Sequence, residues 1–171
     1  TMVKDIISCY KDNIANISFM SSDTKKKAIL KLDNMKINIG GSYYDELNYN
    51  LSSKLLIDNV IKINKVLSNR QLEMLNSNNY ESVISPTVVN AYYNPLDNSI
   101  NFPASLKELY NKDDNYYSNL GSVGMIIAHE ITHAFDNNGS KFDEVGNRFD
   151  WWNDKDYYNF EKFQKRACAL P

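Results

Sequence analysis

Apolar residues recur with the period of an α-helix in several parts of the chain. This spacing places apolar side chains on one face of a helix and polar side chains on the other. Segment 3–19 has this helical spacing, so a helix is expected there. A second helix is expected over 22–35, because the serines before it are good N-cap residues. A long periodic stretch over 51–67 predicts a helix that faces the core, and a last helix is expected over 154–167.

Shorter segments between these helices have the pattern of β-strands. Lys36–Ile39 alternates and ends at a Gly-Gly pair, and Pro86–Tyr93 is rich in valine and tyrosine. Turn residues at 94–98 allow Ser99–Phe102 to pair back as a hairpin, and a short helix is expected at 104–110. The pattern therefore predicts one α+β domain over 1–171, mostly helical, with a small antiparallel hairpin or sheet.

Composition and charge exclude some functions and partners. The net charge is −2, and the run Lys25-Lys26-Lys27 is interpreted as a solvated face rather than an anion site, so nothing indicates a nucleic-acid partner. No apolar run approaches 18 residues, so no transmembrane helix is expected, and the first residues do not have the pattern of a signal peptide. The two cysteines, Cys9 and Cys168, leave open one long-range disulfide or two buried thiols.

The chemistry of the chain is concentrated in one more predicted helix, over 120–136. It contains both histidines of the chain, His129 and His133, with Glu130 between them. Residues four apart lie on one face of a helix, so the two imidazoles can bind one metal ion. The neighbouring carboxylate can then accept a proton from a metal-bound water, which is the logic of the H-E-x-x-H pattern. A chance pair of surface histidines is the alternative, and the apolar residues around the motif argue against it.

The residues after the histidines bear on two questions, namely what orients the imidazoles and what could be the third metal ligand. Asp136 lies on the same face and can orient an imidazole by accepting its hydrogen bond, although capping of the helix end is an alternative role. A catalytic zinc site also needs a third protein ligand. Asp136 and Gly139 stand where the metzincin pattern requires glycine and histidine, which excludes that class. Glu144, in a glycine-containing loop, and Glu161, among aromatic and basic residues, are both poor candidates for the third ligand.

Several motifs accompany the histidine helix in a fixed order along the chain. They are Asp23–Ala28, Lys36–Gly40, Val89-Asn-Ala-Tyr-Tyr-Asn-Pro95, Ile100-Asn-Phe-Pro-Ala104, His129-Glu-Ile-Thr-His-Ala-Phe-Asp136 and Asp150-Trp-Trp152. Together they resemble the neprilysin family of zinc endopeptidases, which includes the endothelin-converting enzymes and bacterial oligopeptidases of the PepO type. The similarity extends over nearly the whole chain.

The resemblance implies a thermolysin-like (gluzincin) catalytic domain that hydrolyses peptide bonds of oligopeptides with Zn²⁺. His129 and His133 would be metal ligands, and Glu130 the general base. Asn90 and Ala91 match the pair that holds an extended peptide along a strand edge. From the residues alone, Asn90 would be a turn residue at a strand end. The nearby aromatic residues are expected to be core residues rather than substrate contacts: Tyr92, Tyr93, Phe102, Trp151 and Trp152.

The chain departs from the family in one respect. The third zinc ligand of the family is the Glu of a later E-x-x-x-D motif, which has no counterpart in this sequence. The resemblance therefore implies a part of the catalytic domain, with weak or no activity by itself and with the C-terminal part of that domain as a partner. The alternative is a non-catalytic fragment or domain with an incomplete metal site, which acts by binding peptides or a partner.

Overall fold

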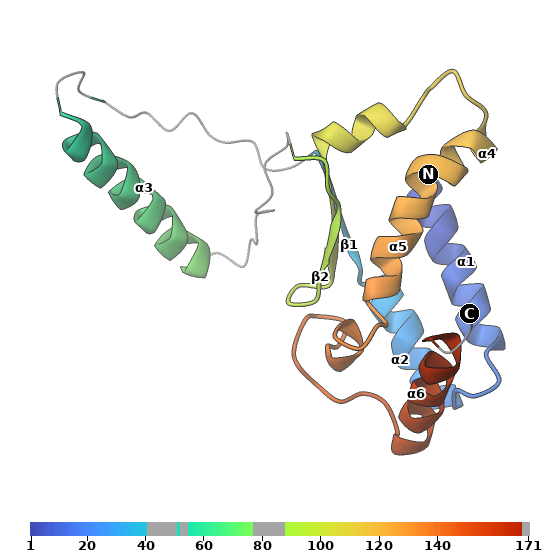
Figure 1. Cartoon of the computed structure of the whole chain (residues 1–171). Helices are drawn as coiled ribbons and strands as arrows, with labels where there is room; N and C mark the ends of the chain where they lie inside the picture. The colour runs from blue at the N-terminus through green and yellow to red at the C-terminus, as the bar shows by residue number, and fades with distance from the viewer. Residues whose placement is uncertain (41–50, 52–54, 77–87, 169–171) are drawn as a thin grey trace.

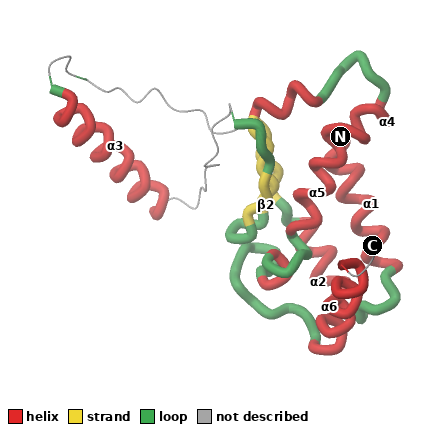
Figure 2. The backbone as a smooth tube through the Cα atoms, in the orientation of Figure 1, coloured by secondary structure: helices red, strands yellow, loops and turns green. Residues whose placement is uncertain are grey.

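The computed structural model describes residues 1–40, 51, 55–76 and 88–168. Helices α1 (Met2–Asn16), α2 (Ser22–Asp33), α5 (Met125–His133) and α6 (Asp154–Cys168) gather on one side of a small sheet (Figures 1 and 2). α1 contacts both α2 and α5 and buries one apolar face, which confirms the helix expected there. The Ser21 hydroxyl accepts the Thr24 N–H at the start of α2, as an N-cap should.

The sheet has three strands in the order β1-β3-β2, with β1 at Lys36–Gly40, β2 at Tyr92–Asn94 and β3 at Ser99–Pro103. β2 and β3 form the expected antiparallel hairpin, in which Tyr93 faces Ile100. β1 pairs with the other edge of β3 in parallel, and here Ile37 faces Ile100. Every residue of β3 is buried, so this strand is the centre of the sheet.

The second strand is shorter than expected. Within the described residues it begins at Tyr92, although the pattern indicated a start at Pro86, which lies outside them. The Val88 carbonyl explains the difference, because it accepts the N–H of Asn90 and the hydroxyl of Ser105. These local bonds turn the backbone and take an acceptor that a strand would use in its ladder.

Helix α3 (Leu56–Asn76) corrects another expectation. A helix exists there, but it is not core-facing: Leu56 is 80% exposed and Ile61 59% exposed. Figure 1 shows α3 standing apart from the other helices. Helical periodicity identifies a face that can be buried, but it does not identify what that face packs against.

The segment before the histidines is built from short elements. It runs through the 3₁₀-helix η1 (Ala104–Leu109), the single turn α4 (Tyr116–Asn119) and the π-helical η2 (Leu120–Gly124), which leads directly into α5. The short 3₁₀-helix η3 (Gly139–Lys141) follows α5. Among the described residues, no helix is long and apolar enough to cross a membrane. Cys9 is free and exposed rather than buried, and the side chain of Cys168 lies outside the described part.

Asp156 connects α6 to the turn between α1 and α2. It is 3% exposed, and its Oδ2 accepts hydrogen bonds from Ser21 N (2.8 Å), Ser21 Oγ (2.6 Å) and Asn153 Nδ2 (2.6 Å). Burial by itself would raise the pKa of this carboxyl, but the hydrogen bonds, those from Ser21 above all, bring the pKa below its ordinary value. The folded protein therefore favours the carboxylate form of Asp156.

Replacing Asp156 by Asn should lower the free energy of unfolding by about 1–3 kcal/mol near neutral pH, because hydrogen bonds to a charged group are lost. A lowered folded pKa means that the contribution is complete above the unfolded value of about 3.9 and is lost as pH falls below it. Urea unfolding at several pH values should show a constant difference from wild type near neutral pH and a shrinking one below about pH 4.

The exposed neighbour Asp154, in the same first turn of α6, provides the control. Asp154→Asn removes a charge near the same helix end and should change stability by less than about 0.5 kcal/mol. A stability difference for Asp156→Asn that stays the same at all pH values would contradict the assigned role of the carboxylate.

Candidate metal centre

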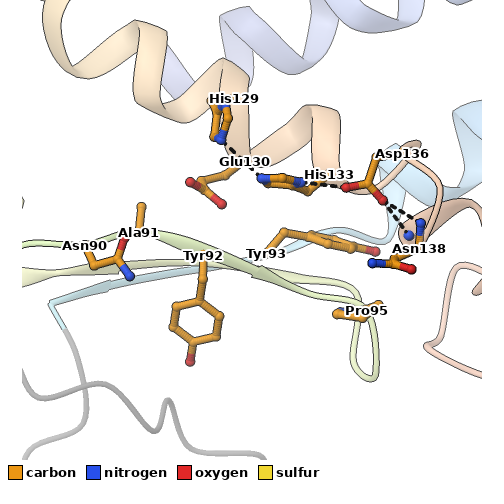
Figure 3. Close-up of a pocket in the computed structure, with 11 residues that line it drawn as sticks. Asn90, Ala91, Tyr92, Tyr93, Pro95, His129, Glu130, His133, Asp136 and Asn138 are labelled. Atoms are coloured by element: carbon orange, nitrogen blue, oxygen red, sulfur yellow. Dashed lines mark hydrogen bonds and ion pairs between the residues drawn. The ribbon is translucent and has the colours of Figure 1, made fainter. Parts of the chain in front are cut away.

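Helix α5 is held in a fixed orientation behind the histidines. Its inner face buries Ile127 and Ile131 in the core. From α1, the Tyr10 hydroxyl donates to the carbonyl of Ala128 at 2.9 Å. These contacts leave the opposite face, with His129 and His133, turned towards β2 and the residues before it (Figure 3).

The two imidazoles are brought together at their ε nitrogens. Nε2 of His129 lies 3.1 Å from Nε2 of His133, and the rings are nearly perpendicular, with 4.7 Å between their centroids. Two nitrogens bound tetrahedrally to one Zn²⁺ at about 2.0–2.1 Å are about 3.3–3.4 Å apart. The spacing and the donor type therefore fit two ligands of a single zinc ion.

Asp136 lies on the far side of His133. Its Oδ2 is 2.6 Å from Nδ1 of His133, and its Oδ1 accepts the backbone N–H groups of Asn138 and Gly139, each at 2.8 Å. Burial by itself would raise the pKa of Asp136, but these hydrogen bonds bring the pKa below its ordinary value. When a carboxylate accepts the N–H of one ring nitrogen of a histidine, the lone pair of the other ring nitrogen is available for a metal.

Glu130 and the residues before β2 face each other across a cavity of about 420 Å³. Glu130 is 6% exposed, and its carboxylate points from α5 towards the Asn90–Tyr93 segment (Figure 3). The cavity wall is made of this segment, the histidine face of α5 and the turn that follows α5. Residues far apart in the sequence thus enclose one space that contains imidazole and carboxylate groups.

Asn90 and Ala91 lie at the cavity, but immediately before the strand rather than on it. Asn90 is exposed and Ala91 is buried. Among the aromatic residues expected in the core, Phe102, Trp151 and Trp152 are buried.

Tyr92 and Tyr93 depart from that expectation, since they are half-buried and line the cavity. The Tyr93 hydroxyl donates to Oδ1 of Asn98 at 3.0 Å, and burial raises the pKa of Tyr93 above its usual range.

The described residues do not complete a three-ligand site. Within 1–40, 55–76 and 88–168, no three His, Cys, Asp or Glu side chains are grouped so that they could hold a metal ion. Glu144 and Glu161 therefore do not form a three-ligand group with the histidines. This agrees with the sequence analysis, in which both were poor candidates for the third ligand.

One residue near the candidate centre was not predicted from the sequence. Lys31 of α2 is buried with its ammonium at the end of α5. It lies on the apolar face of α2 with Ala28 and Leu32, both buried. A charged residue on an apolar helical face was the signal that could have identified it.

Comparisons with known proteins agree on one family. Two models described as peptidase family M13 match residues 1–43 and 90–170, which together are more than two thirds of the chain. Neutral endopeptidase of Lactococcus lactis subsp. cremoris is 37% identical over 178 residues, which cover 99% of this chain and 28% of that protein. Neprilysin-2 of Drosophila melanogaster is 36% identical over 169 residues, which cover 88% of this chain and 21% of that protein.

Solved structures give the same result. The zinc metalloprotease ZMP1 of Mycobacterium tuberculosis, in complex with an inhibitor, matches with a TM-score of 0.79 and 32% identity over 96% of this chain and 26% of its own. PepO from Lactobacillus rhamnosis HN001 matches with a TM-score of 0.77 and 34% identity over 96% of this chain and 27% of its own. This chain thus spans less than a third of the length of these relatives.

Proposed function

This chain belongs to peptidase family M13, as its resemblance to neprilysin indicated, and we propose that it forms the zinc-binding part of an endopeptidase that hydrolyses oligopeptides. One observation carries the proposal. The ε nitrogens of His129 and His133 converge to 3.1 Å beside a cavity into which the Glu130 carboxylate points. Neutral imidazole nitrogens at this spacing suit Zn²⁺.

Each residue around the cavity has a role in this proposal. His129 and His133 hold the metal through Nε2, and Asp136 keeps the proton of His133 on Nδ1. When bound, Zn²⁺ supplies Lewis-acid polarisation of the peptide carbonyl and lowers the pKa of water. Glu130 accepts the proton of the attacking water and returns it to the leaving amine. Its burial keeps this proton transfer away from bulk solvent.

Substrate binding is assigned to the other wall of the cavity. Asn90 is exposed there and can donate and accept hydrogen bonds through its side-chain amide. The backbone at Ala91 continues into β2, so an extended peptide laid beside it can bond to the main chain. We propose that these two residues hold the substrate with its scissile bond towards Glu130.

The small number of zinc ligands among the described residues supports a second candidate function. Within the described residues, no third acidic, histidine or cysteine side chain stands with the two imidazoles. Two imidazoles hold zinc less firmly than three ligands. We therefore propose that the 171-residue chain by itself has weak or no peptidase activity, and that the competing function is the binding of peptides or of a partner.

Zinc content after extensive dialysis and hydrolysis of quenched fluorescent peptides, measured on one sample, separate these functions. We expect weak zinc binding and little hydrolysis. Where hydrolysis is detected, Glu130→Gln should keep the zinc and lower the rate by about 10²–10⁴-fold, because only the general base is removed.

Three other outcomes would change these proposals. Tight zinc at one ion per chain, with hydrolysis that Glu130→Gln abolishes, would contradict the inactive-chain proposal and require a third ligand, for which Glu161 would be replaced first. Saturable peptide binding without zinc or hydrolysis would support the binding function. Absence of zinc, hydrolysis and peptide binding would contradict both functions.

A further inference from the structure

A lysine ammonium lies buried behind the end of the histidine helix. Lys31 is 1% exposed, and its Nζ donates to the carbonyl oxygens of Ala134 (2.9 Å), Gly139 (2.6 Å) and Phe142 (2.6 Å). An ammonium group has three N–H donors, so three backbone carbonyls use all of them. Figure 1 shows the corresponding arrangement, with α2 beside the C-terminal end of α5.

Burial of a charged group among neutral acceptors costs free energy, even where hydrogen bonds offset part of that cost. Burial lowers the pKa of Lys31 to about 8, even though Asp143, Asp136 and Glu144 favour the charged form. The end of α5 compensates in part, because a positive charge is favourable at a helix C-terminus. An apolar residue in its place would leave three carbonyls without this donor.

The three carbonyls belong to a single segment, 134–142, which folds back after α5 and contains η3. The same segment carries Asp136. Gly139 links the two, because its carbonyl accepts from Lys31 while its N–H donates to Asp136 Oδ1. From Asp136 the chain of hydrogen bonds continues through Oδ2 to Nδ1 of His133.

Lys31 is also fixed from its other side. Its backbone carbonyl accepts the side-chain amide of Asn98, which is fully buried and also donates to the carbonyl of Glu144. The ammonium lies 5.8–5.9 Å from the ring centroids of Tyr93, Phe135 and Trp151. A side chain packed in this way has little freedom to leave its acceptors.

We propose that Lys31 is a positioning residue of the metal centre: it fixes the 134–142 segment and so keeps Asp136 where it orients His133. The inference rests on the proposed function, since it takes His133 to be a metal ligand. Loss of an outer partner of a ligating histidine typically weakens metal binding by about 10–100-fold. Lys31 acts one step further out, and its removal should weaken zinc binding by about 10-fold.

The test compares Lys31→Met with Lys26→Met in the 171-residue chain. Lys26 is on the same helix, but its side chain is exposed and pairs with Asp23 at the surface. Zinc affinity is measured by competition with a chromophoric chelator. Two-bond ¹H–¹⁵N spectra of the metal-free proteins report which ring nitrogen of each histidine carries the proton. The chain has two histidines, so one histidine variant assigns the signals.

In wild type and in Lys26→Met, we expect His133 to be protonated at Nδ1. In Lys31→Met, this preference should be lost while the remaining fold is retained, and zinc binding should weaken about 10-fold. Unchanged His133 signals and zinc affinity in folded Lys31→Met would overturn the proposal. A merely structural role would lower stability without moving the tautomer of His133.

If Lys31→Met does not fold, the same two measurements, zinc affinity and the protonated nitrogen of His133, are made on Lys31→Arg. It keeps the positive charge, but a planar guanidinium presents its donors in a different geometry. We expect a folded protein with a smaller change in the same two measurements, and wild-type values in both would overturn the proposal. A wild-type chain that binds no zinc would refute the proposed function, whereas the metal-free histidine spectra would still test the role of Lys31.

Discussion

Gly139→Ala is expected to destabilise the fold and to separate Asp136 from His133. A Cβ at this position would lie 1.9 Å from the carbonyl oxygen of His133 and 2.9 Å from the carbonyl carbon of Ala134. Both are backbone atoms, so rotation of a side chain cannot relieve the overlap. The segment after α5 must therefore move away from the helix end.

This movement breaks contacts on both sides of Gly139. Its N–H donates to the Asp136 carboxylate and its carbonyl accepts from the Lys31 ammonium, so two charged groups lose a partner. Overpacking costs about 1–3 kcal/mol and a hydrogen bond to a charged group about 1.5–3 kcal/mol. We expect a loss of about 3 kcal/mol or more in the free energy of unfolding, measured by urea denaturation.

Gly121→Ala provides the matched control. A Cβ at Gly121 meets no atom within 4 Å, and the residue lies in a helical stretch where alanine is favourable. Its stability should stay within about 0.5 kcal/mol of wild type or rise slightly. Equal stabilities for the two alanine variants would show that the close approach of Gly139 to the helix end is not part of the protein in solution.

His133→Ala should have the largest effect on metal binding. It removes one of the two imidazole nitrogens at the proposed centre together with the group that Asp136 orients. We expect zinc affinity to fall by more than about 100-fold, beyond the range typical of outer partners. Asp136→Asn, which keeps both imidazoles but removes the carboxylate charge that holds the hydrogen bond to His133, should lower zinc affinity by about 10–100-fold.

Asn137→Ala serves as the control next to these positions, since Asn137 is exposed and lies outside the residues that line the cavity. It should leave zinc affinity unchanged. Circular dichroism of all three variants shows whether the helices persist. If folded His133→Ala bound zinc as wild type does, the metal centre would have to lie elsewhere in the chain.

Features that depend on neighbouring residues were accessible from the sequence. The cap at Ser21, the hairpin between β2 and β3 and the shared face of His129 and His133 all follow from spacings of a few residues. Helix and hairpin geometry determine these contacts once the period of the pattern is known. For this reason the Asp136–His133 hydrogen bond was also anticipated, although the role of Asp136 in orienting a metal ligand stays a prediction.

Features that depend on distant partners were not accessible. The parallel pairing of Ile37 with Ile100 leaves no mark in either strand. The exposed apolar residues of α3 show the opposite case, in which a clear periodic pattern did not indicate burial against the described core. Lys31 lies between these cases, because its place on an apolar face was visible but its three carbonyl partners come from a distant segment.

The central position of β3 also affects the sequence in which the strands of the sheet are expected to pair. β2 and β3 are close in sequence, and hairpins of this kind form in about 1–10 μs. β1 must arrive from the far side of the long segment between Lys36 and Ser99, and such non-local pairing is slow. Until then the outer edge of β3 carries backbone groups that are not yet paired and can pair with another molecule. Conditions that delay the docking of β1 should therefore favour aggregation over folding, because pairing with β1 covers this edge of β3.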